Sequence, residues 1–148
     1  MEIPRKSFYR YFSSKDGALY ALIDHTLLDF EQQTGILTGN ALGNVARELQ
    51  HFFAFWQERR QLLDALERSG LSGVLVQRAI SQAQNEYVPS RSPANPEIGA
   101  VQYHAVTFAI CGLMSMVTRW HRSGYSESVT EMAQIATTLL TRPLIGEK

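Results

Sequence analysis

The side chains with the clearest chemical character lie in the first 15 residues, where basic, hydroxyl and aromatic groups are interspersed. Those suited to contact a polyanion are Arg5, Lys6, Ser7, Tyr9, Arg10, Tyr11 and Lys15. A tyrosine ring can pack on a protein body while its hydroxyl reaches a phosphate oxygen. Lys15 stands at the start of the next predicted helix, where free backbone amides also attract an anion. The pattern predicts a short phosphate-gripping helix over 5–9, anchored by Phe8 and Phe12.

The charge of the chain is unevenly distributed, although its formal net charge is zero. Residues 1–15 carry four cations and one acid, which gives +3 and leaves −3 on the remaining residues. A basic start on a mildly acidic body favours a protein that meets a polyanion at one end only.

Glu48 and His51 form the one Glu-x-x-His element, a pattern that supplies metal ligands in some helical bundles. A di-metal site needs two such elements and two further glutamates on facing helices. No glycine-rich phosphate loop, nucleophile elbow or zinc-ligand spacing is present in the sequence. Cys111 lies among small and apolar residues, a setting typical of packing rather than of nucleophilic chemistry. We therefore expect no enzyme activity, no metal and no other cofactor.

Composition and cysteine usage indicate the compartment. The chain has 45% hydrophobic and 19% charged residues, which is typical of a globular protein. A single cysteine cannot form an internal disulfide, which favours a reducing environment. The N-terminus lacks the continuous apolar stretch of a signal peptide, and no uninterrupted apolar run approaches the roughly 20 residues that cross a bilayer. These features predict a cytoplasmic protein without membrane contact.

Apolar residues recur at intervals of three and four along most of the chain, and no segment alternates in the manner of a β-strand. The spacing predicts a helix over about 16–33, after N-cap oxygens from Ser13 and Ser14. A glycine-rich run over 35–43 follows it. A long second helix is expected from Val45 to the end signal at Ser69 and Gly70.

A third helix over about 71–86 is expected to end before the proline-rich segment 87–97, which predicts a loop. A long helix over about 97–122 follows, apolar nearly all round in its middle, so it needs partners on several sides. Gly124 is expected to end it, and Ser126 can cap a last helix that runs to about residue 141. The predicted fold is all-α, with five main helices behind a short basic one.

The segment from Ser7 to Leu19 closely resembles the end of the helix-turn-helix in the TetR family of bacterial transcriptional regulators. The matching residues are Ser7-Phe8-Tyr9-Arg10-Tyr11-Phe12, Ser14-Lys15-Asp16 and Leu19. The resemblance implies that Arg5, Lys6 and Ser7 face the major groove. It also implies that Tyr9, Tyr11 and Lys15 contact the DNA backbone, with Arg10 among the DNA-binding residues.

The resemblance also implies a division of the chain. Residues 1–15 would be the remnant of the helix-turn-helix domain, and 16–148 the helical ligand-binding and dimerisation domain. The segments 62–71 and 112–124 look like one subtype of that TetR-like C-terminal domain, whose last two long helices form a dimer bundle with two helices from each subunit. A recognition helix is held in place by two preceding helices, so we expect DNA binding only with those upstream helices present.

Two sets of residues are candidates for binding, and for each the alternative is simple packing in the core. Those predicted to line a pocket for a small apolar effector are Phe52, Phe55, Trp56, Tyr103, His104 and Phe108. Those predicted to contact a second copy of the chain are Gly112, Met114, Ser115, Val117, Trp120, Met132, Ile135 and Leu139.

The function that the resemblance implies is a homodimeric, DNA-binding transcriptional regulator, expected to be a repressor, whose body binds a small effector. A second possibility is a stand-alone α-helical dimer that binds a ligand or partner and has no DNA reader. A third is a di-metal enzyme built on a helical bundle.

Overall fold

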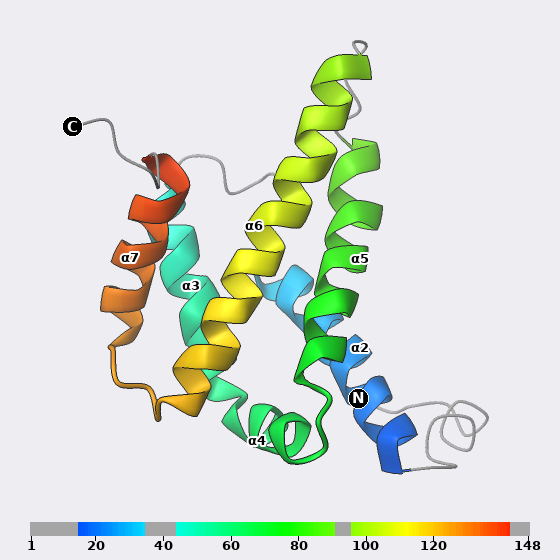
Figure 1. Cartoon of the computed structure of the whole chain (residues 1–148), viewed down its shortest axis with the longest axis vertical. Coiled ribbons are helices and arrows are strands. Elements are labelled where there is room, and N and C mark those ends of the chain that lie inside the picture. The colour runs from blue at the N-terminus through cyan, green and yellow to red at the C-terminus, as the bar shows by residue number, and fades with distance from the viewer. Residues whose placement is uncertain (1–14, 35–43, 91–95, 143–148) are drawn as a thin grey trace.

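The computed structural model describes residues 15–34, 44–90 and 96–142, and these ranges are helical with no β-strand (Figure 1). The helices are α2 (Lys15–Thr34), α3 (Val45–Glu58), α4 (Arg60–Arg68), α5 (Ser72–Ser90), α6 (Pro96–Arg122) and α7 (Val129–Thr141). The predicted all-α class is therefore confirmed for the described part of the chain. The expected short helix over 5–9, the caps at Ser13 and Ser14 and the run 35–43 lie outside these residues.

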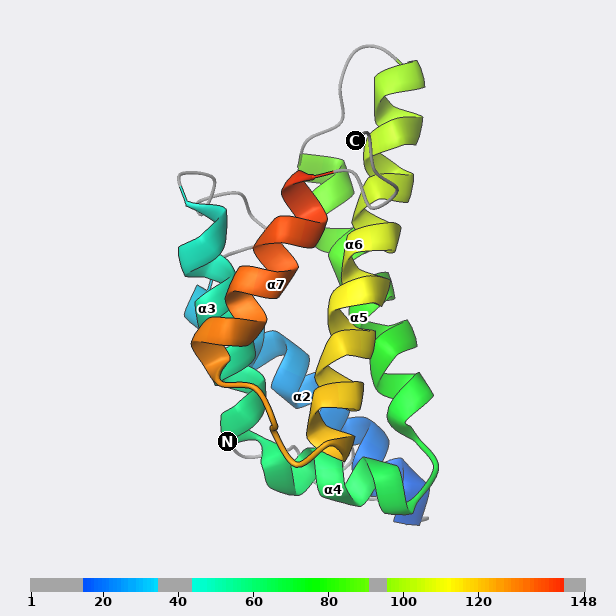
Figure 2. The same ribbon diagram turned by 60° about the vertical axis from the view of Figure 1, so that its left-hand side comes forward.

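Two helix pairs build the body. Helix α5 lies along α6, and α7 lies along α3, while α2 packs against α3, α4 and α5 (Figure 2). The largest fully buried side chains come from all of these helices except α7, and they are Ile23, Phe53, Trp56, Leu66, Leu75, Met114 and Val117. One apolar core thus joins both pairs.

The long second helix was predicted as continuous, and this is wrong: it is divided at Arg59 into α3 and α4. Arg59 adopts φ −103° and ψ 33°, and its guanidinium donates a hydrogen bond to the Phe55 carbonyl at 3.0 Å while lying over the Phe55 ring. The apolar period continues across the bend because α3 and α4 bury their stripes in the same core. Periodicity alone therefore does not reveal the break.

The predicted helix ends at Gly70 and Gly124 are confirmed, and both glycines have the positive φ that ends a helix without strain. The last helix, however, is capped by Ser128 and not by Ser126. Ser128 accepts a hydrogen bond from the backbone of Glu131, whose carboxylate accepts one from the Ser128 backbone. This reciprocal capping box satisfies two helix-end amides, which Ser126 lacks the spacing to do.

The prolines break the chain less than predicted. Helix α5 continues to Ser90 through Pro89, which lacks a backbone N–H and so removes one i to i−4 hydrogen bond, and the helix ends one residue later. Pro96 occupies the first position of α6, where its fixed φ suits a helix start. Residues 91–95 lie outside the described ranges.

Within the described residues one stretch, Gly99–Arg122 of α6, is long and apolar enough to cross a membrane by length and composition, with a mean hydropathy of 1.4. Glycines, a serine and threonines interrupt the segment, so it is not an uninterrupted apolar run, and the absence of membrane contact stays a prediction. Only 17% of the window is buried inside the chain. Much of this apolar helix is thus uncovered in a single copy.

Candidate functional site

Four helices, α2, α3, α5 and α6, enclose a small internal cavity of about 20 Å³, which is room for about one water molecule. Its walls are almost wholly apolar, and they are formed by Leu27, Phe30, Phe52, Trp56, Ala79, Gln82, Ala83, Ile110 and Met114. Seven of its nine lining side chains are buried and the space is small, so a ligand larger than water would have to displace helices or side chains to enter.

Aromatic contacts between α2 and α3 build one wall of this cavity. Phe30 meets the edge of Phe52 at 5.7 Å and of Phe55 at 5.1 Å between ring centroids. It lies more nearly parallel to Trp56, at 6.3 Å and 26°. Such pairs contribute roughly 0.5–1.5 kcal/mol each beyond the area they bury. The position of α2 is therefore coupled to the shape of the cavity.

Polar contacts tie α2 to α5 beside the cavity. The Gln82 amide nitrogen donates to the Leu27 carbonyl at 3.0 Å. One turn earlier on α5, a single guanidinium nitrogen of Arg78 donates to both carboxylate oxygens of Asp24, at 2.6 and 2.5 Å. Because Gln82 and Leu27 both line the cavity, enlarging it acts directly on the α2–α5 contact.

The six predicted pocket residues do not share one cavity. Phe52 and Trp56 line it, and Phe55 is buried next to them without lining it. Tyr103, His104 and Phe108 instead lie on exposed faces of α6, with Phe108 71% exposed. These three side chains do not line the internal cavity, but His104 and Phe108 line an open groove between α6 and α7. A ligand site at these residues stays a prediction.

Sequence reasoning missed seven of the nine residues that line the cavity, among them Phe30, Gln82 and Met114. Phe30 belongs to the apolar stripe that predicted the first helix. Gln82 gave a usable signal, because it lies one position before Ala83 and three after Ala79, which are both buried. A polar side chain beside a buried stripe needs a partner, and here that partner is the Leu27 carbonyl.

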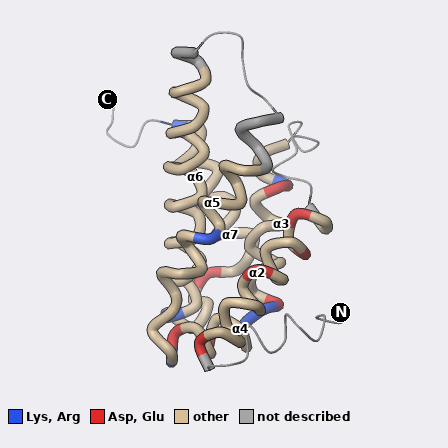
Figure 3. The backbone as a smooth tube through the Cα atoms, turned by 90° about the vertical axis from the view of Figure 1, so that its right-hand side faces the viewer, with Lys and Arg blue, Asp and Glu red and all other residues tan. Residues whose placement is uncertain are grey.

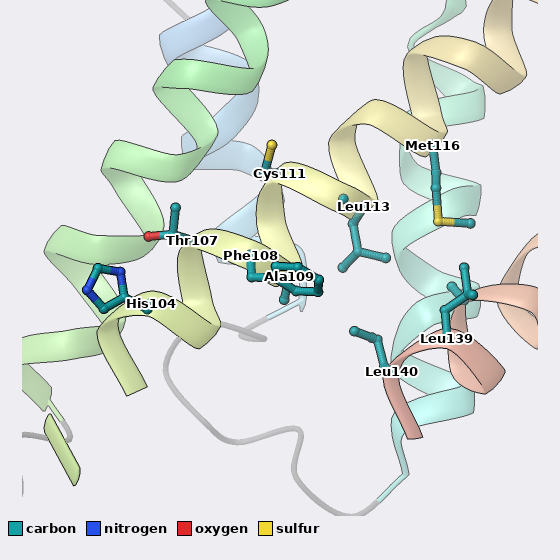
Figure 4. A pocket seen from close by; sticks show the side chains of 11 residues that line it. His104, Thr107, Phe108, Ala109, Cys111, Leu113, Met116, Leu139 and Leu140 are labelled. Atoms are coloured by element: carbon teal, nitrogen blue, oxygen red, sulfur yellow. The ribbon is translucent and has the colours of Figure 1, made fainter. Parts of the chain in front are cut away.

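A second feature is an open apolar groove of about 670 Å³ between α6 and α7 (Figure 4). It is lined by His104, Thr107, Phe108, Ala109, Cys111, Gly112, Leu113, Met116, Ala136, Leu139 and Leu140. Leu113 and Met116 of α6 lie across from Leu139 and Leu140 of α7, whereas Cys111 points away from α7. A side-chain carbon added at Gly112 would meet nothing within 4 Å. The two helices therefore leave a wide apolar surface between them.

The predicted dimer residues divide into two groups. Met114, Val117, Trp120 and Met132 are buried in the core of the single chain, so little of their surface is left for a second copy. This corrects the interface assignment of these four residues, because their large side chains fill the core of the single chain. Gly112, Ser115, Ile135 and Leu139 are exposed. The exposed apolar side chains Val101, Phe108 and Leu140 extend the same face.

Charged residues occur around α4 and the end of α6, as well as on α2 and α3, whereas residues 99–118 of α6 contain no Lys, Arg, Asp or Glu (Figure 3). His121 Nε2 lies 2.6 Å from Asp64 Oδ1, and Arg122 Nε donates to Glu67 at 2.8 Å. The bond from Arg122, with a further one from Ser72, holds the pKa of the Glu67 carboxyl below its usual value. These pairs fasten α6 to α4.

No known protein family, curated protein or solved structure matches the chain. The site is therefore interpreted from the chain's own residues.

The predicted DNA-binding residues Arg5, Lys6, Ser7, Tyr9, Arg10 and Tyr11 lie outside the described residues, and α2 begins at Lys15. Glu48 and His51 approach to 3.9 Å. In the part of the chain that the structure describes, no three His, Cys, Asp or Glu residues gather closely enough to hold a metal ion.

Replacing Tyr125 with phenylalanine is expected to stabilise the fold by about 1 kcal/mol. The Tyr125 hydroxyl is buried and has no hydrogen-bond partner among the described residues. Burial raises the pKa of this phenol above 10, with Asp64 adding to the effect and Arg60 opposing it. The unfolded chain ionises first, so the wild-type protein loses stability as the pH rises above about 10.

Urea unfolding of both proteins at pH 7 and at pH 10.5 tests this expectation. The difference in free energy of unfolding between the variant and the unaltered protein should be larger at pH 10.5, because phenylalanine cannot ionise. Tyr103→Phe is the matched control, since the Tyr103 hydroxyl donates to Gln84 at 2.9 Å and its removal should not stabilise the fold. A variant at Tyr125 that is less stable at pH 7 would show that the hydroxyl has a favourable partner.

Proposed function

We propose that this chain is the sensing and dimerising part of a TetR-like DNA-binding transcriptional regulator, a repressor that acts in the cytoplasm. The observation that carries the proposal is the double role of α2. This helix starts at Lys15, within the basic motif that resembles the end of a helix-turn-helix. Farther along, it contributes Leu27 and Phe30 to the wall of the internal cavity. One rigid element thus runs from the proposed DNA reader to the proposed sensor.

The cavity supports a mechanism based on a population shift. At about 20 Å³ it is closed to an effector, so a bound effector stabilises a conformation in which the cavity is larger. Enlargement displaces α2, because the Gln82–Leu27 hydrogen bond and the Arg78–Asp24 ion pair tie α2 to α5. In a dimer, a shift of α2 changes the separation of two recognition helices, which must match half-sites about 34 Å apart.

The exposed apolar face of α6 and α7 supports homodimerisation. It combines the open groove with Phe108, Ile135, Leu139 and Leu140, and few isolated chains leave so continuous an apolar surface in water. A two-fold dimer would also fit a palindromic operator.

Mobility-shift assays test the DNA-binding part of the proposal. The chain extended upstream through a two-helix start should bind one operator sequence specifically, whereas residues 1–148 alone should not, because the recognition helix lacks its packing partners. Removing the charges of Arg5 and Lys6 in the extended protein should abolish specific binding. Asp24→Asn should retain DNA binding but weaken release by an effector, since it loosens the tie between cavity and α2.

Equal and specific binding by the shorter chain would contradict this account of the recognition helix. If the extended protein binds no DNA but still dimerises, the chain is instead a stand-alone α-helical module. The cavity and the apolar face would then serve a ligand or partner alone.

A further inference from the structure

The two tryptophans of the chain differ in one respect. The indole nitrogen of Trp120 donates a hydrogen bond to the Glu127 carbonyl at 2.8 Å. Trp56 is completely buried, with an exposed fraction of 0%, yet its Nε1 has no hydrogen-bond partner among the described residues. Buried donors are nearly always paired in folded proteins, so an unpaired one requires an explanation.

The place of Trp56 suggests that explanation. Its indole forms part of the wall of the internal cavity, next to Phe30 and Phe52. The other polar wall residue, Gln82, already uses its amide nitrogen on the Leu27 carbonyl. Leaving a donor unpaired in a core carries a cost in free energy, because the donor has lost its bond to water. A ligand that supplied an acceptor to Nε1 would recover that cost, so the unpaired indole favours one class of ligand over others.

The remaining wall defines the rest of the ligand. No Lys, Arg, Asp or Glu lines the cavity, so a charged group would be buried there without a counter-ion. The ring edges and faces of Phe30 and Phe52 suit a flat apolar or aromatic body. Ile110 and Met114 form the α6 side, and a methionine side chain adapts readily to a new shape.

We infer that the cavity takes a small, uncharged aromatic molecule with one hydrogen-bond acceptor, such as a carbonyl oxygen, which accepts the N–H of Trp56. This inference rests on the proposed effector site and specifies its ligand. Trp56 is then the specificity-determining residue. A molecule with the shape of this ligand but without an acceptor binds less tightly than its apolar surface alone would allow, because the N–H of Trp56 stays unpaired.

Acetophenone and α-methylstyrene are suitable probes, because they share one shape and differ in a carbonyl oxygen against a methylene group. Two indole N–H signals are expected in a ¹H–¹⁵N spectrum of the protein, one for each tryptophan, and a Trp120→Phe variant assigns them. Acetophenone should move the Trp56 signal downfield and leave the Trp120 signal in place. α-Methylstyrene should not produce the downfield shift.

Binding constants of both probes to the wild-type protein and to Trp56→Phe give the second measurement. The preference for acetophenone over α-methylstyrene should fall about tenfold in the variant, while α-methylstyrene binding is retained. The Trp120 signal reports whether the variant is folded. If it is not, the indole shift in the unaltered protein decides the question.

The outcomes separate the two proposals. In one outcome both probes bind, the indole signal of Trp56 stays in place, and the preference for acetophenone is the same in both proteins. The acceptor inference is then wrong, and the effector cavity stands. If neither probe binds, both the inference and the proposed effector site are overturned.

Discussion

Replacing Phe53 with alanine lowers the free energy of unfolding by about 3–5 kcal/mol. The Phe53 side chain is fully buried and meets the edges of Phe52 at 5.0 Å and of Trp120 at 5.6 Å. It thereby joins α3 to the end of α6, where the two helix pairs of the body meet. Alanine would remove both ring contacts and leave a void that backbone movement fills only in part. The whole free energy of unfolding of a single domain is about 5–15 kcal/mol, so this one change could remove most of the stability of the fold.

Urea unfolding followed by circular dichroism measures the effect, with Phe108→Ala as the matched control. Phe108 undergoes the same chemical change but is 71% exposed, so its loss should alter stability by no more than about 0.5 kcal/mol. The unaltered chain and both variants should be compared at a concentration at which all three are monomeric, because Phe108 lies in the face proposed to meet a second copy. Equal losses for the two phenylalanines would contradict the position of the core described above.

Replacing Leu139 with aspartate is expected to convert a dimer into a monomer. Leu139 is 42% exposed on α7 and lines the groove next to α6, in the face proposed to meet a second copy. In a two-fold dimer each substitution occurs twice, so two carboxylates would be buried without counter-ions. We expect the dissociation constant to rise at least about 100-fold, equivalent to about 2.7 kcal/mol.

Light scattering at micromolar concentration measures this effect. The unaltered chain should have twice the 16.7 kDa mass of one copy, and the variant the mass of one. Leu28→Asp is the control, because Leu28 is 50% exposed but lies on α2. A dimer that survives Leu139→Asp, or an unaltered chain that is already monomeric, would remove the proposed interface.

The helices and most of their ends follow from local sequence. Apolar spacing predicts the span of α2 almost to the residue, and the glycines that end α4 and α6 do so because only they adopt a positive φ at no steric cost. The bend at Arg59 and the cap at Ser128 were missed. The bend depends on packing in the core, which the apolar period does not reveal. The capping box of Ser128 and Glu131, by contrast, follows from a spacing that the sequence itself contains.

The site was only partly predictable for a different reason. Phe52 and Phe108 are the same residue type in helices of similar character, yet one lines an internal cavity and the other projects into solvent. Likewise, both tryptophans are buried, but only the turn after α6 brings a carbonyl to Trp120. The sequence by itself determined that the chain forms amphipathic and apolar helices, because that property is set by neighbours three and four residues away. The tertiary structure alone decided which apolar face meets another helix, which face remains open and which buried donor is left without an acceptor. These features depend on segments that folding brings together from distant parts of the chain.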